Sequence, residues 1–345
     1  MDAASPKIIL ERLKEEWIGV ADASIYRELE LERQLWMLAA LQTLHADDIS
    51  APDGQGVGSA TVASRKALSL YENKGKFRQS TVLIHHIYLR FIASSSFLSA
   101  SNPTLEIHHL STSPLLPKHY PNVRPLAVPG PSAQLPYASN IFAHIHAFSL
   151  PAILPASSMP ALLKECYRTL VSAHSITSPA ASPTTPSFST QSKGGSLHLT
   201  ILDPSPIPST LGPLLRAWLD THLIVNLERQ FRCINPARLF PIWLADAGLR
   251  AEGSTISNVR FLASVSHDPD GFSMIDGAGQ EQGVVSAECT KQELKSILGR
   301  MLWKEIWGPF VEGEKWWWED VLVVEECERV GTCWEYAVIE AVKEG

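Results

Sequence analysis

The sequence predicts an α/β protein, in which a mainly parallel β-sheet is covered by helices on both faces. From residue 81 onward, short apolar runs alternate with amphipathic helical stretches, which is the pattern of βαβ units. Before this alternation begins, residues 5–45 carry apolar side chains at helical spacing. Two more apolar runs end the chain on either side of Gly331, and we interpret them as an antiparallel hairpin near residues 321–343.

The N-terminal part is predicted to form a helical cap on the main core. Its apolar residues recur three and four positions apart, as on one face of a helix. They are Leu29, Leu31, Leu35, Trp36, Leu38, Leu41 and Leu44. A polar, glycine-rich loop at 46–60 and a short helix at 61–73 are expected to follow. We therefore assign residues 1–75 to the cap and residues 76–345 to the α/β domain; the alternative is a partner-binding helix.

The alternating part divides into strands and helices of ordinary length. Strands are predicted at 81–87, 104–110, 141–150 and 196–204. Helices are predicted at 88–100, 158–173, 210–230 and 291–310. The apolar stripe of the second helix is Leu162, Leu163, Cys166 and Leu170, which indicates one buried face. The closing hairpin would pair residues 321–330 with 332–342 around the turn at Val330, Gly331 and Thr332.

Residues 174–193 interrupt this pattern. The segment is rich in Ser, Thr and Pro and almost free of large apolar side chains. Such a composition cannot bury enough surface to offset the entropy lost on ordering. We expect a disordered surface insertion between a helix and the next strand.

Composition excludes several classes of protein. The net charge is −7, whereas a general nucleic-acid binder needs a basic face to neutralise phosphates. No apolar stretch approaches the ~20 residues that span a bilayer, and the N-terminus carries acids where a signal peptide is apolar. Five scattered cysteines indicate reduced thiols, including Cys327 and Cys333 on the expected hairpin, where packing is favoured over a metal. We expect a soluble protein of the cytoplasm or nucleus, with no nucleic-acid or membrane partner.

The order of elements, together with one long stretch of sequence, resembles the class I, S-adenosylmethionine-dependent methyltransferases. The matching features are Leu135-Pro136-Tyr137, a strand from Ile141 to Phe148, Glu165-Cys166-Tyr167-Arg168 and Gly194-Gly195. In type-11 members these correspond to a Leu-Pro-Phe loop, a strand, a helix ending near Glu-x-x-Arg, and a Gly-Gly turn. The resemblance covers residues 80–265 and the terminal hairpin, and is greatest to fungal members, including the segment 231–250. It implies a Rossmann-like, seven-stranded sheet whose last strand is inserted antiparallel.

The glycine-rich turn that follows the first strand in this family is not retained. Glycine there lets the backbone approach the cofactor without a Cβ clash. In the alignment that the resemblance implies, the first-strand acid corresponds to Ile84, and the three glycines correspond to His86, Tyr88 and Arg90. Tyr88 and Arg90 would fill space that the methionyl part of the cofactor needs, and Tyr88 is the better candidate for a plug. The only other glycine-rich turn, 53–58, follows no apolar strand and is interpreted as a flexible loop.

The family's acidic residues are also replaced. The acid that accepts hydrogen bonds from the ribose, at the end of the second strand, corresponds to Ser111. The acid near the adenine corresponds to Pro131, and the acid after the Phe of the next strand corresponds to Ala143. These losses predict an eroded S-adenosylmethionine site unless the alignment is out of register. A pseudo-enzyme that binds or regulates a protein partner is the first hypothesis; an active methyltransferase using S-adenosylmethionine in an unusual pocket is the second.

Other polar residues suggest weaker hypotheses. His85, His86, His108 and His109 end two predicted neighbouring strands, but two imidazoles on one face are too few for a firm zinc site. His146 is the candidate for a surviving general base, against a structural role that we favour. Asp203 follows a strand and either contacts a substrate or caps a helix. Trp316, Trp317 and Trp318 are expected to pack in different directions, with one facing solvent. No catalytic residue, substrate or oligomeric state follows from the sequence.

Overall fold

The computed structural model describes most of the chain. The described residues are 5–15, 17, 22–50, 81–85, 92–148, 150–173, 194–265 and 281–345, with backbone alone at 42–50, 81–85, 92–94 and 281–288. The predictions made for residues 51–60, for the helix at 61–73, for the turn after the first strand and for the insertion at 174–193 lie outside the described residues.

The chain divides into two compact units. One unit contains residues 1–69, 203–227 and 259–335, and is called the helical unit below. The other contains residues 70–202, 228–258 and 336–345, and is called the sheet unit. The domain boundary expected near residue 75 stays a prediction.

The strands form a seven-stranded sheet in the order β3-β2-β1-β4-β5-β7-β6. They are β1 Thr81–His85, β2 Glu106–Ser111, β3 Val123–Ala127, β4 His144–Ala147, β5 Ser196–Leu202, β6 Thr255–Leu262 and β7 Cys333–Val342. The pairs β3/β2, β2/β1, β1/β4 and β4/β5 are parallel, whereas β7 pairs with β5 antiparallel, with Ser196 opposite Val342. An antiparallel last strand inserted between β5 and β6 is the arrangement that the resemblance implies, so the Rossmann-like class I fold is confirmed by strand order.

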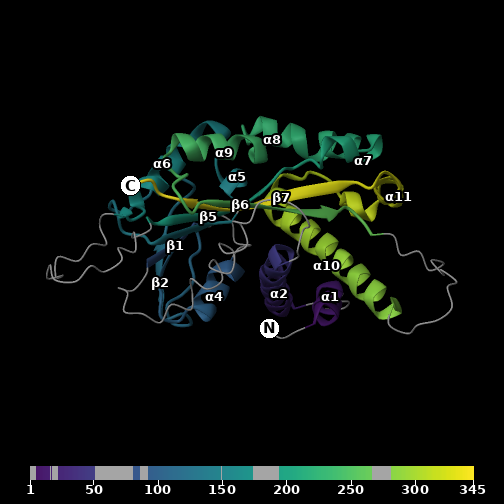
Figure 1. Cartoon of the computed structure of the whole chain (residues 1–345), viewed down its shortest axis with the longest axis horizontal. Helices are drawn as coiled ribbons and strands as arrows, with labels where there is room; N and C mark the ends of the chain where they lie inside the picture. The colour runs from purple at the N-terminus through teal and green to yellow at the C-terminus, as the bar shows by residue number, and fades with distance from the viewer. Residues whose placement is uncertain are drawn as a thin grey trace. The chain divides into compact units, whose positions relative to one another are not determined.

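Helices of the sheet unit cover both faces of its strands. These helices are α4 Ile92–Ser101, α5 Leu150–Ile153, α6 Met159–Thr169 and α9 Pro236–Asp246. In Figure 1, α6 and α9 lie on one face of the sheet and α4 lies on the other. The predicted apolar stripe of α6 is buried, at Leu162, Leu163 and Cys166, with Leu170 buried just beyond the helix. It packs in one core with alternate residues of the strands, such as Leu197 and Leu199 of β5.

The helical unit contains the predicted N-terminal helices. α1 Pro6–Lys14 and α2 Ala23–Ser50 pack against the long helix α10 Glu281–Trp307 (Figure 1), with Met37 and Leu298 in their shared core. α2 runs five residues into the loop expected from residue 46. The region 210–230 was predicted to form one or two helices. It contains α7 Pro213–Leu219, a π-helical turn Asp220–Ile224 and α8 Val225–Arg229. The last two residues of α8, 228 and 229, belong to the sheet unit.

The expected C-terminal hairpin is wrong in its first half. Residues 321–330 form a helix, α11 Val321–Val330, and only the second half is the strand β7. The Asp320 carboxylate caps the helix by accepting a hydrogen bond from the Leu322 N–H, 3.0 Å away, and Gly331 ends it with φ of 69°. Val323, Glu326 and Cys327 are buried at helical spacing. The run of β-branched valines favoured a strand, but the capping residues and this spacing decide for a helix.

β3, α9 and β6 were not predicted from the sequence, and neither was the short helix α5. β3 is an edge strand with Pro125 in its middle, and a proline argues against a strand when only local pattern is considered. α9 contains Pro241 in its interior. β6 is an edge strand that alternates exposed residues with less exposed ones, and only Val259 and Phe261 are fully buried.

Two structural findings concern the class of protein. None of the described helices is long and apolar enough to cross a membrane. All five cysteines lie within the described part of the chain, and all five are free thiols.

Candidate ligand-binding edge

Ser111 lies where the resemblance expects a ribose-binding acid, at the carboxyl end of β2. It is 3% exposed, and its main-chain oxygen accepts a hydrogen bond from Val128 N–H, 3.0 Å away. Its hydroxyl accepts a further hydrogen bond from the Ser113 N–H, at 3.2 Å. Ser111 therefore holds together the ends of β2 and β3, and its side chain is engaged with its own loop.

A hollow of about 620 Å³ begins directly after β3. Its lining residues are Val128, Pro129, Gly130, Pro131, Ser132, Gln134, Leu135 and Pro136. Pro131, the position corresponding to the adenine-binding acid, is exposed in this lining. The lining side chains carry no charge, and the Gln134 N–H is used by a hydrogen bond to the Ser132 hydroxyl at 3.1 Å. The hollow offers apolar surface and main-chain groups to a ligand.

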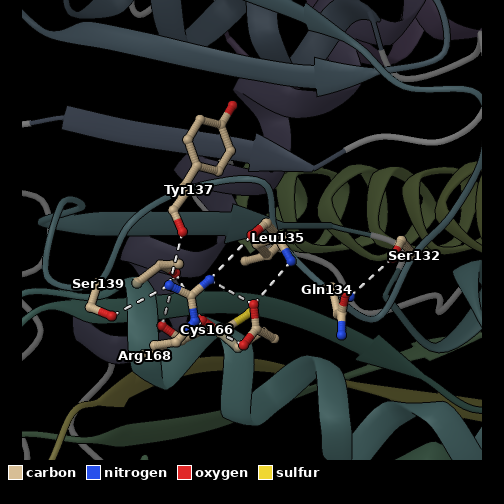
Figure 2. Close-up of polar contacts among 9 residues, drawn as sticks. Ser132, Gln134, Leu135, Tyr137, Ser139, Cys166 and Arg168 are labelled. Atoms are coloured by element: carbon tan, nitrogen blue, oxygen red, sulfur yellow. Dashed lines mark hydrogen bonds and ion pairs between the residues drawn. The ribbon is translucent and has the colours of Figure 1, made fainter.

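The wall of this hollow is held by the Glu-x-x-Arg motif at the end of α6. Arg168 donates to both carboxylate oxygens of Glu165, at 2.8 and 2.7 Å, and to the main-chain oxygens of Leu135 and Tyr137, at 3.2 and 2.8 Å. Glu165 accepts a hydrogen bond from the Leu135 N–H in return, at 3.1 Å. Figure 2 shows the guanidinium group between these partners.

This contact between the Leu-Pro-Tyr loop and Glu-x-x-Arg joins two motifs that are 30 residues apart in the sequence. Hydrogen bonds from Arg168 lower the pKa of Glu165, and the same pair raises the pKa of Arg168. Both side chains therefore remain ionised, and the bidentate geometry fixes the loop's direction as well as its position. We name this arrangement of Glu165, Arg168, Leu135 and Tyr137 the loop clamp.

Tyr137 projects from the loop clamp into an aromatic cluster. Its ring contacts His108 and Phe142 edge-on, with centroids 5.6 and 4.8 Å apart. Burial raises its pKa to about 12, and its hydroxyl has no hydrogen-bond partner among the described residues. The role of Tyr137 is therefore that of an aromatic packing residue, in the position where the resembled family has Phe.

The carboxyl end of β2 and β3 lacks carboxylates. Between residues 81 and 148 the sequence contains one acidic side chain, Glu106. Glu106 is the first residue of β2, at the opposite end of the strand from Ser111, and it pairs with Arg124 at 2.8 Å. No acid from this part of the chain can therefore replace the missing family residues at Ser111 or Pro131.

The histidines of β2 face opposite sides of the sheet. His108 is in the aromatic cluster with Tyr137, and desolvation lowers its pKa. His109 is buried on the other face, where its Nδ1 accepts a hydrogen bond from the Leu115 N–H at 3.1 Å, and burial lowers its pKa to about 4. Of the predicted histidine group, the side chains of His85 and His86 lie outside the described residues. The described residues contain no group of three or more His, Cys, Asp or Glu that could hold a metal ion.

A second histidine group lies on β4 and β5. The Ser196 hydroxyl is 2.9 Å from both His144 Nδ1 and His198 Nε2. His146 stacks on His198, with centroids 4.5 Å apart, and burial lowers the pKa of His146 to about 3. Such a weak base is poorly suited to accept a proton at neutral pH. The group thus favours a structural role for His146; His198 and Ser196 were not singled out from the sequence.

The remaining sequence predictions divide in two. His86, Tyr88 and Arg90, with the expected plug of the cofactor site, lie outside the described residues and stay predictions.

In the helical unit, Trp317 is fully buried, while Trp316 and Trp318 are half-buried and stack on each other. The three tryptophans were predicted to point in different directions. Trp317 does differ from the other two, whereas the rings of Trp316 and Trp318 are parallel. Asp203 takes part in a polar contact, so neither of its proposed roles is decided.

No family model and no curated protein matches this chain. Solved structures with a similar arrangement include a putative methyltransferase from Bacillus halodurans, at 12% identity and a TM-score of 0.39, covering 81% of this chain and all of that one. Another is geranyl diphosphate C-methyltransferase from Streptomyces coelicolor, solved with Mg²⁺, geranyl diphosphate and S-adenosyl-L-homocysteine. Its identity is 11% and its TM-score 0.39, and the match covers 85% of this chain and 86% of that one. These are weak similarities, and the fold assignment comes from the strand order.

Proposed function

We propose that this chain is a methyltransferase-like protein that does not transfer methyl groups and instead binds or regulates a protein partner. The observation that carries the proposal is the absence of acidic side chains at the carboxyl ends of the described strands β2 and β3. Ser111 and Pro131 occupy the two positions where the resembled family places carboxylates. The one acid of this region, Glu106, is at the far end of β2.

The missing carboxylate matters because of the hydrogen bonds that a ribose requires. A ribose diol presents two O–H donors, and one carboxylate can accept from both. The Ser111 hydroxyl has a single oxygen, which already accepts from the Ser113 N–H. A neutral hydroxyl also accepts more weakly than a charged carboxylate. Ser111 is therefore a poor substitute for the acid.

The hollow after β3 supports the second candidate, an active methyltransferase with an unusual pocket. It lies at the edge where the resemblance expects the cofactor, and its apolar lining suits a flat ring. Its lining, however, contains no carboxylate that could accept from both ribose hydroxyls and no charged group that could pair with the methionyl end. The hollow is thus the observation in favour of the second candidate, and the missing carboxylate is the observation against it.

Calorimetric titration of the whole chain with S-adenosylmethionine distinguishes the two candidates. We expect no binding at about 1 mM cofactor, with an established methyltransferase as the control for the titrant. Micromolar binding would overturn the proposal.

A filled-pocket variant then locates any binding that is observed. Gly130 lines the hollow, and a Cβ there would meet nothing within 4 Å, so Gly130→Trp is the substitution chosen to fill it. Binding that Gly130→Trp abolishes would identify the hollow as the cofactor site of an active enzyme.

A further inference from the structure

The first turn of α11 exposes two aliphatic side chains at positions where a helix favours acids. Val321 is 67% exposed and Leu322 is 65% exposed, directly after the capping residue Asp320. The positive end of the helix dipole favours acidic side chains in the first turn, and the first turn of α11 contains none. Side chains so exposed also bury little surface within the chain. The stability of the helix therefore does not account for this pair.

A third exposed aliphatic side chain comes from α7, which contacts α11 within the helical unit (Figure 1). Leu214 is 45% exposed, and its N–H donates a hydrogen bond to the Glu326 carboxylate at 3.1 Å. Leu322 and Glu326 are four residues apart on α11, so they share one face of that helix. Leu214 therefore lies beside the face that carries Leu322.

Three exposed acids accompany these aliphatic side chains. Glu319 and Asp320 come directly before Val321 in the chain. Glu325 follows Val321 by four residues on α11, so the two side chains are neighbours on the surface of the helix. We name this set the acidic apolar patch; its members are Leu214, Glu319, Asp320, Val321, Leu322 and Glu325.

No base neutralises the acids of this patch. The elements around it carry three exposed bases, which are Arg216, Lys315 and Arg329. Neither these nor any other base among the described residues forms an ion pair with an acid of the patch. The patch thus presents aliphatic side chains next to unpaired negative charge.

We propose that the acidic apolar patch binds a basic amphipathic segment of another protein, in which apolar side chains are flanked by Lys or Arg. Its charge selects this occupant. A second copy is disfavoured, because a two-fold contact would bring the acids of one copy towards those of the other. The same acids repel the phosphates of nucleic acid and the anionic surface of a membrane.

This inference rests on the proposed function, because it names the chemistry of the protein partner. The patch belongs to the helical unit, whereas the hollow after β3 is lined by residues of the sheet unit. Peptide binding and cofactor binding are therefore separate measurements. Micromolar binding of S-adenosylmethionine would overturn the proposed function whatever the peptide does. A chain that binds neither ligand would overturn only the present inference.

Fluorescence anisotropy with a synthetic peptide tests the inference on the whole chain. The probe is a labelled peptide of about 14 Leu and Lys residues, with Leu three and four positions apart so that one face is apolar. We expect a Kd on the order of 10 µM at about 20 mM salt, which rises as salt screens the acids. Peptides with Glu for every Lys, or with Ser for every Leu, should bind at least about tenfold more weakly.

An apolar variant with a matched control locates the binding. Val321→Ser combined with Leu322→Ser should raise the Kd at least about tenfold, as for an interface anchor. Both positions are exposed, so the free energy of unfolding should change little, which urea unfolding checks. The control is Ile242→Ser, which removes an apolar side chain that is 54% exposed on α9 of the sheet unit.

A charge variant tests the acids in the same way. Glu325→Lys should raise the Kd by about threefold or more. Glu325 is preferred because Glu319 and Asp320 each accept a main-chain hydrogen bond, at 3.0 Å. The control is Glu11→Lys, the same change of charge at an exposed position on α1, which lies apart from α11 in Figure 1.

Absence of binding by the Leu/Lys peptide up to about 300 µM would overturn the inference. So would equally tight binding of the Glu-containing peptide. Patch variants that change the Kd no more than their controls would show that the peptide binds elsewhere, and would overturn it as well.

Discussion

Glu326 and Gly212 pack so closely in the helical unit that no side chain fits between them. A Cβ atom at residue 212 would lie 2.3 Å from the Glu326 carboxyl carbon. Glu326 is 2% exposed, and its two carboxylate oxygens accept hydrogen bonds from the Leu214 and Leu215 N–H groups, at 3.1 and 3.0 Å. A buried acid on α11 thus caps the first turn of α7, and the glycine before that helix makes the approach possible.

The first prediction concerns this pair. Gly212→Ala should lower the free energy of unfolding by about 2 kcal/mol or more, because the added methyl group displaces the carboxylate from two buried N–H groups. In a Glu326→Ala background the same change should cost much less, because there is nothing left to clash with. Urea unfolding of the two single variants and the double variant measures this coupling. Additive effects of the two changes would contradict it.

The second prediction concerns the loop clamp. Arg168→Lys keeps the charge but loses the planar fork that reaches Glu165, Leu135 and Tyr137 together, so it should lower the free energy of unfolding by about 1–3 kcal/mol. The matched control is Arg260→Lys. Arg260 forms an exposed ion pair with Glu335 at 2.7 Å, and its substitution should lower the free energy of unfolding much less than Arg168→Lys. Equal effects of the two substitutions in urea unfolding would show that the clamp has no special role.

The third prediction concerns acid stability. The pKa of His109 is about 4 in the folded chain, against 6.5 for the free side chain, because burial disfavours the charged form. The unfolded chain therefore binds this proton first. The contribution to stability is complete above pH 6.5 and falls as the pH drops towards 4, by up to about 3 kcal/mol.

His109→Asn tests that assignment, since an amide oxygen can still accept a hydrogen bond from the Leu115 N–H without titrating. The free energy of unfolding of the variant should decrease less steeply between pH 6.5 and 4.5. Parallel curves for the variant and the wild type would mean that other groups, such as His146, account for the loss of stability.

The fourth prediction concerns Tyr137. Because its buried hydroxyl has no partner among the described residues, Tyr137→Phe should leave the free energy of unfolding unchanged or raise it by up to about 1 kcal/mol. The aromatic contacts with His108 and Phe142 are retained in this variant. Guanidinium unfolding measures the effect, and a loss greater than about 1 kcal/mol would show that the hydroxyl is bonded.

The strand pattern placed one position of the candidate site: Ser111 ends β2, next to the strand predicted at 104–110. Pro131 lines the hollow after β3, a strand that the sequence pattern did not predict. The reason for the Gly194-Gly195 turn could not be predicted. A Cβ at Gly194 would lie 2.6 Å from the main-chain oxygen of Lys343, a residue near the other end of the chain. Local pattern contains no information about so distant a neighbour.

The sequence by itself determined the periodicity of the elements and the absence of acids between residues 81 and 148 other than Glu106, since both are properties of neighbouring positions. At Val321–Val330 the local caps Asp320 and Gly331 favour a helix, and the tertiary structure adds the contact of Glu326 with α7 from the buried face of that helix. It also decided that Phe231 is exposed, because the hydrogen bond to Ala156 holds its backbone at positive φ. Contacts between residues far apart in sequence outweigh local preferences of about 1 kcal/mol per residue, and only the folded chain brings those residues together.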